Sequence, residues 1–196
     1  ATVEMNNTFY KMPVASDLRS WARQAPGTFR FALKAPQAIT HRRRLKNAAG
    51  ETRRFLRAAA VLERQLGPLL FQLPPNFKKD LPRLEAFLRL LRAQKRVAFE
   101  FRHASWFDDE TIACLRNHSI ALCTADAEKL PGGDPIRTAD WGYVRLRRER
   151  YTTKSLASWI ERLSSQGWKN AYVFFKHEDT GAGPKLAERF LKLAGA

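Results

Sequence analysis

Seven short stretches with strand-like alternation recur along this chain of 196 residues, and segments with helical spacing separate most of them. A strand repeats every two residues, whereas a helix places apolar residues three or four positions apart. Strands that alternate with helices indicate parallel strands in a barrel or in a doubly wound sheet. The predicted strands are Thr2–Thr8, Phe29–Ala35, Pro68–Leu73, Arg96–Arg102, Ile120–Asp126, Trp141–Arg147 and Asn170–Lys176.

Three of the segments between these strands carry a continuous apolar stripe at helical spacing. They are Glu51–Leu66, Asp80–Gln94 and Ser155–Ser165. Ser16 and Asp80 are of the residue types that cap helix N-termini, and Pro82 suits the first turn of its helix. The sequence therefore predicts an α/β fold in which helices cover the strands.

The number of strands points to a TIM-like (β/α) barrel, because such a barrel has eight strands and seven are visible here. The chain begins directly in a strand, at Val3–Asn6. We expect an N-terminal strand to be missing from this sequence, and an open seven-stranded arrangement is the alternative. The chain has no linker or internal repeat, so residues 1–196 are predicted to form one domain, N-terminally incomplete.

The net charge of +16 is the strongest anomaly of composition. It favours anionic partners such as nucleic acid or phosphorylated metabolites, although the same charge can be spread over solvated helix faces. No apolar run approaches the roughly 20 residues that span a bilayer, and no signal-peptide pattern is visible. We therefore expect a cytoplasmic protein with no membrane partner. Cys114 and Cys123 lack CxxC spacing and are predicted to be reduced core residues.

One face of each predicted strand is apolar throughout, whereas the other becomes polar toward the C-terminal end of the strand. In Ile120–Asp126, for example, we assign Leu122 and Asp126 to this second face. TIM barrels carry their functional sites at the C-terminal ends of the strands, although structural ion pairs can also close a barrel mouth. The residues predicted to gather there are Glu4, Asn6, Lys34, Gln72, Glu100, Arg102, Asp126, Arg145 and Lys176.

The carboxylates of this set suggest acid–base chemistry. Glu100 and Asp126 end neighbouring predicted strands, where mutual repulsion would raise the pKa of one of them. A protonated acid beside an ionised carboxylate can serve as a general acid and base, with Glu4 as a third catalytic candidate. The alternative is a static network in which Arg102 and Lys34 neutralise the acids.

The cations of the set suggest a bound anion. Lys34, Arg102, Arg145 and Lys176 would suit a phosphate or a carboxylate, and arginine can bind either in a bidentate way. Trp106 lies just beyond a strand end, where it could stack on a base or a sugar or pack against the rim.

His41 lies in the loop after Lys34 and is a fourth catalytic candidate, as a proton carrier or a ligand. A divalent metal held by Glu4, Glu100, Asp126 and His41 is a further hypothesis. No HExxH-type spacing or cysteine cluster supports it, so the cofactor stays open.

Four motifs in chain order carry a family resemblance. They are Val3–Tyr10, Phe29–Pro36 with Thr40-His41, Phe71–Pro75, and Glu100–Trp106. With these motifs the chain resembles the YecE-like barrels, a family catalogued as a domain of unknown function (number seventy-two in its series). The resemblance spans nearly the whole chain and implies a TIM-like barrel, and it implies no activity, because none is established for the family.

The chain departs from the family pattern at three places. Members usually begin with a further strand rich in Gly, Ser and Trp, which is absent here. Many carry Arg-x-His-Gly where this chain has Arg145-Leu146-Arg147-Arg148, and paired asparagines where it has Lys176-His177-Glu178. The altered positions make the predicted barrel mouth more cationic.

Our first functional hypothesis is an enzyme that acts by hydrolysis or proton transfer on a phosphorylated or otherwise anionic small molecule. The alternative is a nucleic-acid binding or processing protein that uses the basic tracts Arg42–Lys46 and Arg145–Arg150. A non-catalytic interaction domain is the third. The sequence makes no prediction of the oligomeric state.

Overall fold

Seven parallel strands form the inner layer of the molecule, and each is hydrogen-bonded to the next in chain order. The computed structural model describes residues 1–127, 133–175 and 181–195. In these ranges the strands are β1 (Thr2–Met5), β2 (Arg30–Lys34), β3 (Leu66–Gln72), β4 (Val97–Glu100), β5 (Ala121–Asp126), β6 (Trp141–Leu146) and β7 (Asn170–Phe175). All seven strands predicted from the alternation are therefore present, with ends that differ by up to three residues.

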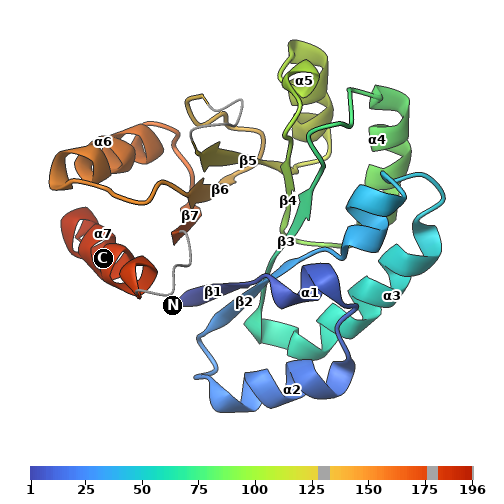
Figure 1. Cartoon of the computed structure of the whole chain (residues 1–196), viewed down its shortest axis with the longest axis horizontal. Helices are drawn as coiled ribbons and strands as arrows, with labels where there is room; N and C mark the ends of the chain where they lie inside the picture. The colour runs from blue at the N-terminus through green and yellow to red at the C-terminus, as the bar shows by residue number, and fades with distance from the viewer. Residues whose placement is uncertain (128–132, 176–180, 196) are drawn as a thin grey trace.

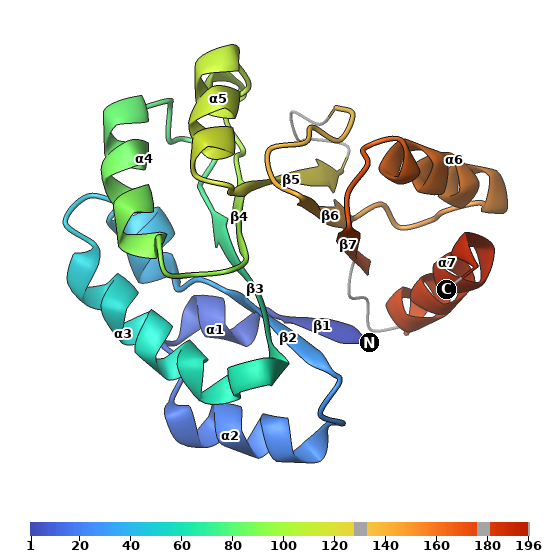
Figure 2. The ribbon, with the colours of Figure 1, turned by 180° about the vertical axis from the view of Figure 1, so that it is seen from behind.

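Helices cover the outer side of these strands. They are α1 (Asn7–Tyr10), α2 (Ala15–Gln24), α3 (Ala49–Ala59), α4 (Leu81–Leu88), α5 (Asp109–Asn117), α6 (Thr153–Ser164) and α7 (Ala182–Ala194), with shorter helical turns η1 (Ala38–Arg42), η2 (Ala60–Gln65), η3 (Arg89–Leu91) and η4 (Ala104–Trp106). The longer helices form an arc around the strands, which Figure 1 shows from one side and Figure 2 from behind. This arrangement confirms the TIM-like α/β barrel. None of the helices in the described ranges is long and apolar enough to cross a membrane.

The barrel is nearly closed, with its opening between β1 and β7. No hydrogen-bonded ladder joins these two strands in the part of the chain that the structure describes. A cavity of about 1090 Å³ lies there, lined by both strands, by α7 and by the side chains of Arg145 and Arg147. In Figure 1 the arc of helices is interrupted at the same place, beside the N-terminus. That a further N-terminal strand exists stays a prediction.

Of the two predicted N-cap residues, Asp80 is confirmed and Ser16 is not. Asp80 caps α4, because its Oδ1 accepts a hydrogen bond from the backbone N–H of Arg83 at 3.1 Å. Ser16 is not a cap, since α2 already begins at Ala15 and Val14 holds the cap position without a side-chain hydrogen bond. The hydrophobic face of α2 decides its start here, because Leu18 lies fully buried against the barrel.

The two faces of the strands pack into separate clusters. Alternate residues such as Leu33, Phe71 and Phe99 lie against the helices. The opposite residues fill the barrel interior, where large rings from β6 and β7 meet small side chains from β2, β4 and β5. The interior cluster comprises Ala32, Leu70, Ala98, Ala121, Cys123, Ala139, Trp141, Tyr143 and Phe174. Large and small side chains thus complement each other across the barrel.

The alternation of β5 has the opposite phase to the one predicted. Leu122 belongs to the helix-facing cluster, whereas Cys123 lies in the interior. Asp126 is in register with Leu146, a residue of another helix-facing cluster, so Asp126 also faces outward. The prediction that Asp126 points into the barrel is therefore wrong. Both faces of this strand are mainly apolar or small, and the crowded interior accepts the smaller set, with Ala121 and Cys123.

Candidate functional site

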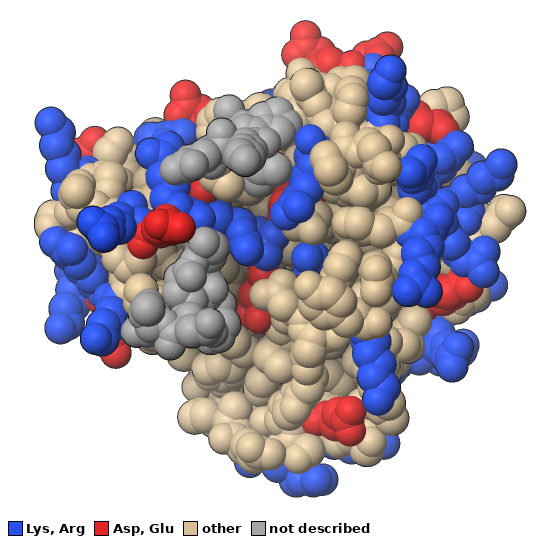
Figure 3. Space-filling view, in the orientation of Figure 1, with Lys and Arg blue, Asp and Glu red and all other residues tan. Residues whose placement is uncertain are grey.

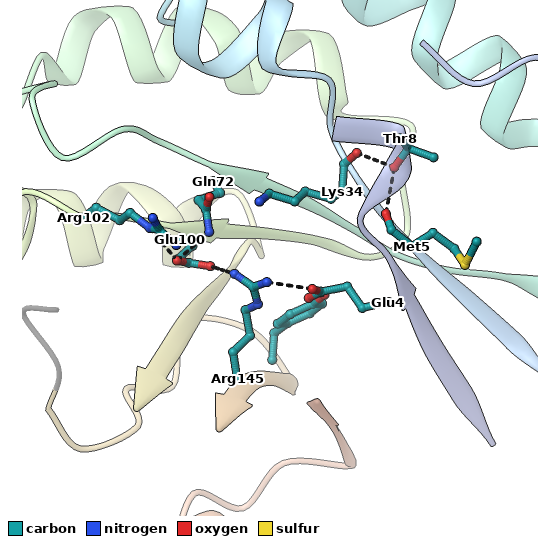
Figure 4. A network of polar contacts seen from close by, with 9 residues as sticks. Glu4, Met5, Thr8, Lys34, Gln72, Glu100, Arg102 and Arg145 are labelled. Atoms are coloured by element: carbon teal, nitrogen blue, oxygen red, sulfur yellow. Dashed lines mark hydrogen bonds and ion pairs between the residues drawn. The ribbon is translucent and has the colours of Figure 1, made fainter. Parts of the chain in front are cut away.

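A buried arginine holds two carboxylates together at the C-terminal end of the barrel (Figure 4). Arg145, on β6, is only 2% exposed. Its Nη1 lies 2.6 Å from Oε2 of Glu100 on β4, and its Nη2 lies 2.7 Å from Oε1 of Glu4 on β1. The ion pairs therefore tie three strands to one another across the interior.

The remaining carboxylate oxygens also have donors. Oε1 of Glu100 accepts hydrogen bonds from Nε2 of Gln72 at 2.7 Å and from Nε of Arg102 at 3.0 Å. Oε2 of Glu4 accepts one from Oη of Tyr143 at 2.6 Å. Gln72 is the register partner of Glu100 on β3, so the strand pairing itself sets their contact. Both acids are thus fully engaged by protein groups.

Electrostatics keep Glu100 ionised. Burial by itself raises the pKa of this carboxyl, but the charges of Arg145 and Arg102 and the hydrogen bonds from Gln72 and Arg145 outweigh burial and lower the pKa to about 2. We predicted that repulsion between Glu100 and Asp126 raises the pKa of one of them. The pKa of Glu100 is lowered instead. The static network that was the alternative describes Glu100 better, with Arg145 and Arg102 as its cations.

Asp126 takes no part in this network. Its Oδ1 lies 2.8 Å from Nε of Arg148, and its Oδ2 accepts a hydrogen bond from Oη of Tyr151 at 2.9 Å. These partners follow β6 on the outer side of the barrel, where Tyr151 packs with Leu146. The structure therefore does not bring Asp126 to Glu100 as an acid–base pair.

Lys34 ends β2 beside the network, with its side chain in the barrel mouth (Figure 4). The residue is 9% exposed, and its Nζ lies 4.0 Å from the centre of the Phe9 ring. Its backbone carbonyl accepts a hydrogen bond from Oγ1 of Thr8 at 2.7 Å, which fixes α1 over this strand. Burial, and next the charge of Arg145, lower the pKa of the Lys34 amine to about 8, although Glu100 and Glu4 act in the opposite sense.

His41 also contacts Phe9. It belongs to η1, a short π-helical turn, and its ring meets the Phe9 ring edge-on at 4.8 Å between centroids. Nδ1 of His41 lies 2.9 Å from Oγ1 of Thr40. Burial, followed by the positive charges of Lys34 and Arg102, lowers the pKa of His41 to about 4. His41 is therefore a neutral imidazole near pH 7.

Arg147 is a further cation of the mouth that the predicted set left out. It follows β6 with the same alternation as Arg145, lines the cavity between β1 and β7, and is half-buried. Burial and the charge of Arg145 lower its pKa. The alternation that selected Arg145 assigns Arg147 to the same inward face, because the two residues are two positions apart.

The other predicted residues have different places. Asn6 is exposed at the end of β1 and lines the cavity. Trp106 is 1% exposed, stacks on Phe101 at 4.7 Å between centroids and donates a hydrogen bond from Nε1 to the carbonyl of Phe77 at 2.8 Å. Neither face of the indole is open to a ligand. Trp106 therefore packs in the rim of the barrel and does not stack on a base. Lys176 lies outside the described residues.

The hypothesis of a metal site finds no support in the geometry. No group of three or more His, Cys, Asp or Glu side chains that could hold a metal ion occurs in residues 1–127, 133–175 and 181–195. Glu4, Glu100, Asp126 and His41 do not converge, because Asp126 faces outward and Arg145 stands between the two glutamates. Cys114 and Cys123 are buried free thiols, as predicted.

The family model described as "Protein of unknown function DUF72" matches residues 1–196. The chain belongs to the DUF72 family. This confirms the resemblance to the YecE-like barrels, which is the same family. No specific function is established for DUF72 proteins, so the chemistry of the site has to be argued from its geometry.

Solved DUF72 structures share the fold. A DUF72 family protein from Thermotoga maritima MSB8 is 31% identical, with a TM-score of 0.81 over 100% of this chain and 85% of that chain. One from Enterococcus faecalis V583 is 20% identical, with a TM-score of 0.83 over the same shares. The curated UPF0759 protein YunF of Bacillus subtilis (strain 168) is 24% identical over 233 residues, which cover 97% of this chain and 82% of YunF.

Proposed function

We propose that the barrel mouth of this DUF72 protein binds an anionic small molecule, phosphorylated or carboxylated, and acts on it by proton transfer or hydrolysis. The observation that carries this proposal is an excess of positive charge. Among the described residues the mouth holds four cations, Lys34, Arg102, Arg145 and Arg147, around two carboxylates, Glu4 and Glu100. A ligand with one or two negative charges would balance the mouth.

Three of these cations, Lys34, Arg102 and Arg147, have N–H groups that could bind a ligand. Lys34 Nζ and the Arg147 guanidinium form no hydrogen bond or ion pair with any residue in the described ranges, and Arg102 uses only its Nε. Charged donors in a partly buried site bind anions strongly, because little water competes with them. Arg145 has a different task, since Glu4 and Glu100 occupy both of its terminal nitrogens.

Proton transfer falls to Lys34 and His41 rather than to Glu100. A carboxylate with a pKa of about 2 is a poor base at neutral pH. The amine of Lys34 has a pKa of about 8, and the imidazole of His41 is neutral near pH 7. Both groups contact Phe9, and the charges of Lys34 and Arg102 act on His41.

The test measures the binding of inorganic phosphate and of glycerol phosphate by titration calorimetry. Arg102→Gln and Arg147→Gln should each weaken binding about tenfold or more, because a charge-assisted hydrogen bond contributes roughly 1.5–3 kcal/mol. The matched control is Arg89→Gln, which removes the same charge from an exposed position of the turn η3 and should leave affinity unchanged. Absence of binding by the parent chain, or an equal loss in the control, would refute the proposal.

Nucleic-acid binding is the second candidate, supported by the charge of +16 and by the exposure of basic residues in both tracts named above. Arg42 and Lys46 of one tract are exposed, as are Arg148 and Arg150 of the other. Figure 3 shows Lys and Arg side chains in several separate parts of one face.

The two candidates make different predictions for a labelled oligonucleotide. Its affinity should fall steeply with salt if phosphates are neutralised, and Arg102→Gln should not affect it. An affinity that stays flat with salt would leave only the small-molecule site.

A further inference from the structure

Among the described residues, the amine of Lys34 has no hydrogen-bond or ion-pair partner, although Glu4 and Glu100 lie in the same site. Arg145, Tyr143, Gln72 and Arg102 occupy the oxygens of both glutamates. In the described part of the chain, the contact of Lys34 Nζ is with the face of Phe9, 4.0 Å from the ring centre. Lys169, on the surface, does contact a carboxylate, that of Asp140, at 2.8 Å.

Lysine differs chemically from the arginines around it. An arginine keeps its proton at all ordinary pH values and acts only as a charged donor. A lysine that loses its proton exposes a lone pair and becomes a nucleophile, above all in a site where it is buried beside other cations. Lys34 meets both conditions, since it is 9% exposed, and burial followed by the charge of Arg145 lowers its pKa to about 8.

We propose that Lys34 is an amine nucleophile that forms an imine with the carbonyl group of an anionic aldehyde or ketone, of which a 2-oxo acid is the simplest example. This inference rests on the proposed function and deepens it. The acid group of the ligand would bind to Arg102 and Arg147, and its carbonyl carbon would face Nζ of Lys34. Phe9 holds the amine in place and shields its far side.

The reaction needs no partner besides the carbonyl compound. The lone pair of the neutral amine forms a bond to the carbonyl carbon, and a proton passes from nitrogen to the carbonyl oxygen to give a carbinolamine. Loss of the hydroxyl group as water then leaves the imine. His41, which contacts Phe9 edge-on and is neutral near pH 7, would carry the proton between these steps. The protonated imine draws electrons from the neighbouring carbon, which eases the proton transfer proposed above.

The experiment traps the imine on the full chain. The protein is incubated with pyruvate and sodium cyanoborohydride, which reduces an imine to a stable secondary amine, and intact mass and peptide mapping locate the label. We expect one adduct per chain, on Lys34, formed at least tenfold faster than on any other lysine. Lys34→Met should lose this adduct and keep its fold by circular dichroism, whereas the exposed control Lys169→Met should keep the adduct.

A neutral ketone separates this inference from the proposed function. Arg102→Gln and Arg147→Gln should slow labelling by pyruvate about tenfold and labelling by acetone much less. Slow, even labelling of surface lysines, or unchanged labelling of Lys34→Met, would overturn the inference. If the chain binds phosphate and Lys34 resists both ketones, the inference fails and anion binding stands. If Lys34 reacts equally with both ketones and phosphate does not bind, anion binding fails and the reactive amine stands.

Discussion

Arg145 and Glu100 form an ion pair across the barrel, from β6 to β4, with 2.6 Å between Nη1 and Oε2. Strand β5 lies between them, and its inward side chains near the pair are those of Cys123 and of Ala125, the register partner of Arg145, which are small. Short side chains on the intervening strand leave space for the long arginine to reach Glu100. The ion pair therefore depends on the packing of the barrel interior as well as on charge.

Removing the arginine should destabilise the fold. Arg145→Met leaves Glu4 and Glu100 as buried carboxylates without their shared cation, which costs about 3–5 kcal/mol in the free energy of unfolding. Urea unfolding measures this change. The control is Arg43→Met, which breaks an exposed pair with Glu51 and should cost less than about 1 kcal/mol. Similar losses in the two variants would contradict a buried structural network.

The stability should fall in acid because of Glu100. Its pKa is lowered from 4.5 to about 2 in the folded chain, so the unfolded chain binds more protons between these values. The stabilisation is present above pH 4.5 and is lost as the pH falls toward 2. Glu100→Gln should flatten this part of the curve of unfolding free energy against pH. Glu161→Gln, at an exposed position of α6, should keep the parent slope. If Glu100→Gln keeps the parent's slope of unfolding free energy against pH, the loss of stability in acid does not come from Glu100.

Lys34 should have the opposite effect on stability. Its pKa is lowered from 10.5 to about 8, so the folded chain binds fewer protons between these values and stability rises with pH there. At pH 7 the charged amine destabilises the fold, and Lys34→Met should stabilise it by up to about 3 kcal/mol, since each pKa unit corresponds to about 1.4 kcal/mol. The stability that Lys34→Met gains over the parent chain should decrease as the pH rises from 8 to 10.5. Lys169→Met, whose side chain is 78% exposed, should change little, and an equal gain there would refute the explanation.

Asp126 should matter for stability and not for the ligand. Asp126→Asn weakens its contacts with Arg148 and Tyr151 on the outer side of the barrel and should cost about 1–3 kcal/mol. The affinity for phosphate should stay within about twofold of the parent value by calorimetry. A loss as large as that of Arg102→Gln would place Asp126 in the mouth after all.

Much of the fold can be predicted from local pattern. The strand period locates all seven strands, because alternation is a property of neighbouring residues. It also assigns Lys34, Gln72, Glu100 and Arg145 to the interior face, since the opposite face of each strand is plainly apolar. Alternation leaves the phase open where both faces are small or apolar, and β5 is that case.

The sequence by itself thus determined the parallel strands, the inward set on most of them and the family. Only the tertiary structure decided the partners: Arg145 between Glu4 and Glu100, Asp126 with Tyr151, and Lys34 beside Phe9. Glu4 and Arg145 are 141 positions apart in the chain. Their contact arises when the barrel curls β1 toward β6, and no local pattern encodes that distance. The burial of these side chains and their charge pairing follow from this closure.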